Sequence, residues 1–241
     1  MDGESSEFKS KGGFKRIVSA FRYSVDGFRT AWQHEHAFRQ ELMVAVPATI
    51  VALVLPVSSF QKLALIVVLG LVLLVELMRA LHNKTKQTVN LSVRQGDEIV
   101  YIDRAFSERS GMQVVRAIGG RGPLHLTSTG KLFLSIDEAK AIRAYATRTG
   151  LAGHNKNSIT DLARLERELS LVRARGYARD NEELELGVRC MAAGIYDDSG
   201  KLVAGLSISA PADRLQEEWL EDLVGIATQI SATLGHRPVA A

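Results

Sequence analysis

The chain has 241 residues and a single cysteine, Cys190, so it forms no internal disulfide, and a reducing compartment fits. Its sequence pI is near 9.0, but residues 1–76 hold 8 Lys and Arg against 7 Asp and Glu, and the rest hold 22 against 20. Neither part has the basic excess of a surface that binds phosphate backbones, which argues against direct DNA binding.

The N-terminal region combines a polar leader with an amphipathic segment. Residues 1–13 are expected to be a disordered leader. Residues 14–32 carry apolar or aromatic side chains every three or four positions, with basic residues beside them, which predicts an amphipathic helix. Such a helix either lies at a lipid surface or packs on a soluble domain.

Two long apolar runs follow. Residues 42–60 contain no charge, and residues 63–75 form a second run after a short turn. The pattern predicts a two-span transmembrane helical hairpin, with the second helix continuing through Glu76. Basic residues cluster before the first run and after the second, so we expect both ends, and the domain that follows, to lie in the cytoplasm of a multi-pass protein of the bacterial inner membrane.

Residues 12–77 resemble the N-terminal half of the small prokaryotic integral-membrane diacylglycerol kinases. The resemblance rests on the string GFKRIVSAFRYSVDGFRTAWQHEHAFRQE and on an apolar hairpin ending in LLVEL. It implies phosphorylation of diacylglycerol or undecaprenol with ATP and Mg²⁺, with Glu35 as a metal ligand and Glu76 as the catalytic base. The sequence departs from the family at Arg79 and Asn83, where that family has Asn and a second metal-binding Glu, and the third span is missing.

After Glu76 the pattern is that of a water-soluble domain, and we expect a boundary between residues 14–76 and 77–241. Residues 88–93 and 98–104 predict a β-hairpin, and 112–118 a third strand. A helix is expected from Leu132 to a stop at Gly150, with Ser135 and Glu138 spaced like a capping box.

The C-terminal part adds two helices and three strands. Residues 158–176 predict a helix whose apolar positions share one face and which ends at Gly176. Strands are expected at 177–180, 188–197 and 202–209, and a last helix after Pro211. Hairpins with helices between them predict an α+β fold, an antiparallel sheet covered by helices.

Residues 77–234 resemble the effector-binding domain of the IclR (isocitrate lyase regulator) family of bacterial transcription regulators. The strings that carry the resemblance are GYARDNEELELGVRCMAAGIYDDSG and GPLHLTSTGKLFL. It implies a GAF-like sheet that binds small organic or aromatic acids, without a cofactor, and that mediates homo-oligomer assembly. By position it implies effector-binding roles for Gly111, Val114, Ser128, Thr129, Asp180, Val188, Cys190, Ser207 and Ser209.

Several of these residues also have simpler readings. Ser207 and Ser209 alternate on a strand and so share one face, with Ile208 on the other. Cys190 is either a small core residue or a ligand contact. Asp180 is either a solvated turn residue or an effector anchor, and Ser128 and Thr129 either line the pocket or cap the helix that follows.

These observations favour a membrane-anchored sensor of small organic acids, whose partners are the acid, the lipid bilayer and further copies of the chain. The winged helix-turn-helix with which IclR regulators read DNA does not precede Leu77, so we expect no direct DNA binding. The alternative function is an integral-membrane diacylglycerol or undecaprenol kinase that uses ATP and Mg²⁺ and is impaired by truncation.

Overall fold

The computed structural model describes residues 43, 47, 74–106 and 118–237. The chain divides into two compact units, Met1–Leu73 and Leu74–Ala241. The description that follows concerns the second unit. The expected amphipathic helix, the expected hairpin and the candidate metal ligand Glu35 lie outside the described residues. Within the described part of the chain, no helix is both long enough and apolar enough to cross a bilayer.

A six-stranded antiparallel sheet forms the centre of this unit. Its strands lie in the order β3-β2-β1-β6-β5-β4. Their bounds are β1 Thr88–Gln95, β2 Glu98–Ala105, β3 Arg121–Pro123, β4 Tyr177–Asn181, β5 Val188–Tyr196 and β6 Leu202–Pro211. The predicted antiparallel sheet is therefore confirmed. The third strand predicted at residues 112–118 lies mostly outside the described residues, and the short β3 was not foreseen.

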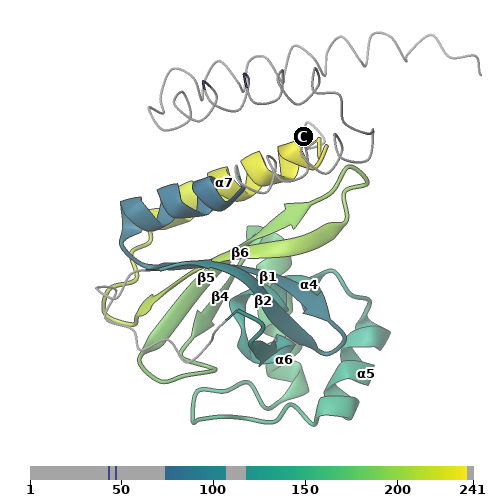
Figure 1. Ribbon diagram of the computed structural model, residues 1–241. Coiled ribbons are helices and arrows are strands. Elements are labelled where there is room, and N and C mark those ends of the chain that lie inside the picture. The colour runs from purple at the N-terminus through teal and green to yellow at the C-terminus, as the bar shows by residue number, and fades with distance from the viewer. Residues whose placement is uncertain (1–42, 44–46, 48–73, 107–117, 238–241) are drawn as a thin grey trace, which may run out of the picture. The chain divides into compact units, whose positions relative to one another are not determined.

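Helices cover both faces of this sheet (Figure 1). On one side lie α4 (Ser128–Ser135), α5 (Ala139–Thr149) and α6 (Leu162–Arg175), preceded by a 3-10 turn η2 (Leu124–Leu126). On the other side α7 (Trp219–Thr233) lies beside a helix over residues 74–85. We call these two sides of the sheet the α4 face and the α7 face.

Alternation along the strands divides the core into two clusters. Leu206 and Ile208 of β6 pack under α7, together with Met78 and Leu81 of the helix at 74–85. Ala192 of β5, whose neighbours on either side belong to the α7 face, joins the cluster under α4 and α6. Neighbouring residues of one strand thus serve opposite faces, as the pleat requires.

The C-terminal end of α6 matches the sequence prediction, whereas its N-terminal end lies at Leu162 and not at residue 158. Asp161 is the N-cap, and its carboxylate accepts hydrogen bonds from the backbone N–H groups of Ala163 and Arg164. Gly176 ends the helix with φ 76°, a conformation that glycine adopts without steric cost.

The single helix expected from Leu132 to Gly150 is in fact two. α4 ends at Ser135, the chain turns through Ile136 to Glu138, and α5 continues to the predicted stop before Gly150. The expected capping box is wrong. The Ser135 hydroxyl donates to the Leu132 carbonyl at 2.7 Å, and Glu138, although it is the N-cap of α5, makes no side-chain capping bond.

Candidate functional site

The α4 face of the sheet gathers most of the predicted effector residues. Strand register pairs Asp180 with Cys190, Cys190 with Ser209, and Ser209 with Thr88. These four side chains form one row across β4, β5, β6 and β1. Because Leu206 and Ile208 pack under α7, Ser207 and Ser209 face α4 together, as alternation predicts.

Ser209 is the centre of the hydrogen bonds in this row. Its hydroxyl oxygen accepts from the Cys190 thiol at 3.1 Å and from the Asn90 side-chain amide at 3.2 Å. A hydroxyl has two acceptor positions and one proton to donate. With both acceptor positions engaged, the Ser209 proton remains to be donated to another group.

Two further hydroxyls on the same face are buried and incompletely satisfied. Thr88 is opposite Ser209, and Ser92 is opposite Gly205. Each is at most 1% exposed, and neither side-chain oxygen has a hydrogen-bond partner among the described residues. Buried polar atoms without partners are uncommon in folded proteins, so these atoms call for a ligand or ordered water.

Asp180 is not a solvated turn residue. It belongs to β4, is 3% exposed, and accepts a hydrogen bond from the backbone N–H of Glu183 at 2.8 Å. Burial and, after it, the negative charge of nearby Glu183 together raise the pKa of its carboxyl to about 7.

A buried ion pair lies beside this carboxyl. Lys131 of α4 has a fully buried side chain, and its ammonium lies 2.6 Å from the Glu183 carboxylate and 3.6 Å from Glu168 of α6. Burial raises the pKa of Glu183, while the Lys131 charge acts in the opposite direction. Through Lys131, α4 is thus linked both to Glu168 of α6 and to Glu183 in the loop that follows β4.

The start of α4 brings Ser128 and Thr129 close to the sheet. The N-cap of α4 is Thr127, whose hydroxyl accepts from the Gly130 N–H, so of the two alternatives for Ser128 and Thr129 the capping role is wrong. Both are buried. Gly205 of β6 leaves room for Thr129, because a Cβ at that position would lie 2.3 Å from the Thr129 methyl carbon.

Arg104 extends the polar face toward the other edge of the sheet. It is opposite Asn90, which is opposite Ser207, so all three side chains share the α4 face. Its guanidinium carbon lies 4.7 Å from the centre of the Phe106 ring, and burial lowers the pKa of the guanidinium. The sequence analysis missed Thr88, Asn90, Ser92 and Arg104. Strand alternation was the signal that could have found the three residues of β1.

The remaining predicted residues are less closely associated with this row. Val188 begins β5 opposite Pro211, and Gly111 and Val114 lie outside the described residues. Glu76, the candidate base, lies on the helix at 74–85 and pairs with Arg79 at 2.7 Å. In the described ranges no three His, Cys, Asp or Glu side chains gather as a metal site would require.

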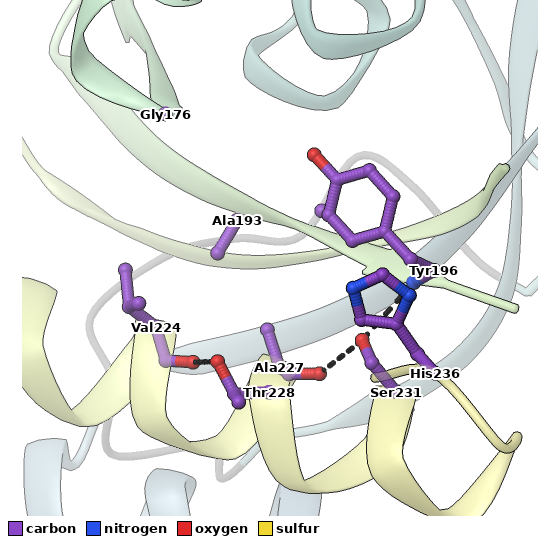
Figure 2. Close-up of a pocket in the computed structure, with 9 residues that line it drawn as sticks. Gly176, Ala193, Tyr196, Val224, Ala227, Thr228, Ser231 and His236 are labelled. Carbon is purple, nitrogen blue, oxygen red and sulfur yellow. Dashed lines mark hydrogen bonds between the residues drawn. The ribbon is translucent and has the colours of Figure 1, made fainter. Parts of the chain in front are cut away.

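A separate cavity of about 140 Å³ lies between β5 and α7, beside Gly176, the residue that precedes β4. Figure 2 shows the Tyr196 and His236 rings close together at its side, with Val224, Ala227 and Thr228 of α7 along its base. None of the predicted effector residues lines it.

Comparison with known proteins relates the chain to two families. Residues 72–235 match the family described as Bacterial transcriptional regulator IclR C-terminal, and residues 22–92 match Prokaryotic diacylglycerol kinase. The chain is 36% identical over 163 residues to the HTH-type transcriptional regulator KdgR of Escherichia coli (strain K12). This match covers 66% of the chain and 62% of KdgR, so the chain spans less than two thirds of the length of that relative.

Solved structures share the fold of the second unit. The crystal structure of the C-terminal domain of E. coli KdgR is 35% identical, with a TM-score of 0.59, and the match covers 68% of this chain and 96% of that one. The inducer binding domain of the PobR transcription factor from Acinetobacter is 27% identical, with a TM-score of 0.59 over 67% of this chain and 94% of that one. That domain was crystallised as a double mutant in complex with 3-hydroxybenzoic acid.

Proposed function

The chain belongs to the IclR family of bacterial transcriptional regulators, matching its C-terminal domain, and from this premise we propose that residues 74–237 bind a small organic acid on the α4 face of the sheet. The acid carboxylate accepts hydrogen bonds from the hydroxyls of Ser209 and Thr88. Cys190 and Asn90 hold Ser209 in place from either side. Binding changes the stability of this unit and its association with other copies of the chain.

The observation that supports this proposal most strongly is the Thr88 hydroxyl. It is buried, lacks a hydrogen-bond partner among the described residues, and lies opposite Ser209, whose own proton is available. Two adjacent donors without acceptors suit a carboxylate, which only accepts. Hydrogen bonds to a charged group contribute about 1.5–3 kcal/mol each, so losing one weakens binding roughly ten- to a hundredfold.

Thr88→Val tests the assignment, because valine has nearly the shape of threonine without its hydroxyl. We expect this variant to bind acids more weakly and to be as stable as the wild type or more stable, since it removes an unsatisfied polar atom. The matched control is Thr147→Val on the exposed surface of α5. Calorimetry with 3-hydroxybenzoate, pyruvate, glycolate and acetate provides the affinities. Equal affinities for the wild type and Thr88→Val would exclude this hydroxyl from the site.

The residues up to Val75 support a proposal of their own. The uncharged run at 42–60, the second run at 63–75 and the match of residues 22–92 to Prokaryotic diacylglycerol kinase favour a membrane hairpin that anchors the sensor at the cytoplasmic face of the bacterial inner membrane. Cell fractionation tests this anchor. Full-length chain that pellets with membranes and is released only by detergent agrees with it, whereas full recovery in the supernatant would contradict it.

The same match favours lipid kinase activity as a second candidate function. In such a reaction Glu35 would hold Mg²⁺, which would neutralise charge on the phosphates of ATP, and Glu76 would take the proton of the lipid hydroxyl. The full-length chain in lipid, assayed with ATP, Mg²⁺ and diacylglycerol, tests it. Turnover that Glu76→Gln abolishes would establish the activity, and absence of turnover would exclude it.

A further inference from the structure

The Asp180 carboxyl is enclosed without a cation of its own. It is 3% exposed, and none of the ion pairs among the described residues involves it. One carboxylate oxygen accepts the Glu183 backbone N–H at 2.8 Å, which fixes its orientation. A buried carboxylate that lacks a paired cation is costly, and the protonated form is favoured instead.

The charged groups that face Asp180 add to this preference. From the loop after β4 comes the Glu183 carboxylate, which repels a negative charge on Asp180. Lys131 of α4 attracts it, but the Lys131 ammonium is already 2.6 Å from Glu183 and 3.6 Å from Glu168 of α6. From β5 the facing group is the Cys190 thiol, directly opposite in the register. Glu168 is also 3.5 Å from the Arg175 guanidinium, and the charge of Arg164 acts on Glu183, so these cations are engaged by carboxylates other than Asp180.

An acid bound at Ser209 brings another carboxylate into this row. Only Cys190 separates Asp180 from Ser209 along the row. Two carboxylates that share one enclosed site do not both stay ionised, because their repulsion favours binding of one proton between them. Burial and the Glu183 charge together raise the pKa of Asp180 to about 7, so Asp180 is the group that takes this proton.

Resting on the function proposed above, we propose that the site binds its acid together with one proton from solvent, which Asp180 holds and donates as a hydrogen bond to an oxygen of the bound acid. Asp180 therefore restricts the site to ligands that accept a hydrogen bond at this position. The affinity for a carboxylate is constant below the pKa of Asp180 and falls about tenfold per pH unit above it.

Calorimetry on the full-length chain tests the coupling, with 3-hydroxybenzoate, pyruvate, glycolate and acetate as probes at pH 6.0, 7.0, 8.0 and 8.5. Titrations at pH 8.0 in phosphate and in Tris, whose ionisation enthalpies differ, count the protons taken up. We expect about one proton per bound acid and an affinity at least tenfold weaker at pH 8.5 than at pH 6.0.

Asp180→Asn is the decisive variant, because an amide is always neutral, still accepts the Glu183 N–H, and donates to a carboxylate. It is expected to bind at pH 8.5 as tightly as the wild type binds at pH 6.0, with no proton uptake. Asp213→Asn, at an exposed position, is the matched control and should keep the slope of the wild type. A slope that persists in Asp180→Asn assigns the proton to another group, such as the Cys190 thiol, and overturns the proposal.

A measurement without ligand completes the test. In protein labelled with ¹³C at aspartate carboxyls, the resonance that Asp180→Asn removes should titrate near neutral pH. Titration near the ordinary range of aspartate overturns the coupling whatever binds. Acid binding with an affinity independent of pH overturns the coupling and leaves the proposed function standing. If the folded chain binds none of the acids at any pH, both fall.

Discussion

The buried Lys131 allows the sharpest prediction about stability. Lys131→Met keeps most of the aliphatic stem and removes the ammonium that lies 2.6 Å from the Glu183 carboxylate. The lysine side chain is fully buried and that of Glu183 is 6% exposed, so the carboxylate is left with little water to replace its partner. Removing one member of such a pair costs about 3–5 kcal/mol, a large share of the stability of an ordinary domain.

Urea unfolding of residues 74–241, followed by circular dichroism at pH 7.5, measures this loss. The double variant Lys131→Met with Glu183→Gln should recover most of it, because no unpaired charge remains. The penalty of the single variant should also shrink as the pH falls, since Glu183 then takes a proton. The matched control is Lys140→Met at an exposed position of α5. A loss below about 1 kcal/mol in Lys131→Met would refute the reasoning.

Three further predictions concern the same unit. Gly205→Ala places a Cβ 2.3 Å from the Thr129 methyl carbon, and urea unfolding should show a loss of about 1–3 kcal/mol. Tyr145→Phe removes a buried hydroxyl that lies 2.6 Å from the ring Nδ1 of His125 and accepts a hydrogen bond from the His125 backbone N–H. Thermal unfolding should show that the free energy of unfolding falls by about 1–3 kcal/mol. The folded pKa of Asp180, about 7, lies above its unfolded value, so the wild type loses up to about 4 kcal/mol of stability between pH 4 and pH 7. Asp180→Asn should lack this loss in urea titrations across that range, and a curve parallel to that of the wild type would contradict the raised pKa.

Sequence reasoning located the elements whose signals are local. The stop of α6 at Gly176 was predicted because a helix C-cap is decided within one turn of helix. The hairpin of β1 and β2 followed from alternation on both sides of a turn that contains Gly96. Ser207 and Ser209 were placed on one face because the side-chain period of a strand is fixed.

Elements buried on every side were harder to predict. All eight residues of α4 are buried, including Ser128, Thr129 and Lys131, so the usual assumption that the polar residues of a helix face solvent fails there. Lys131 was missed for the same reason, since a lysine is read as solvent-facing unless its partners, here Glu183 and Glu168, are known. Those partners are distant in sequence and meet only in the folded chain.

The polar residues of β1 were missed because their role depends on strand order. Thr88 and Asn90 become neighbours of Ser209 and Ser207 only because β1 lies beside β6. Sequence alone predicted that β1 forms a hairpin with β2. It did not predict that β6 pairs with the other edge of β1, which places β1 in the middle of the sheet. The unsatisfied Thr88 hydroxyl is a property of that arrangement.

The central claim is that a small acid binds on the α4 face, and the most direct test is mapping by NMR. The backbone and methyl resonances of the full-length chain are recorded while 3-hydroxybenzoate, pyruvate, glycolate or acetate is added. The account predicts shifts centred on Thr88, Cys190 and Ser209. Shifts centred instead on Tyr196 and His236, at the separate cavity beside α7, would contradict it.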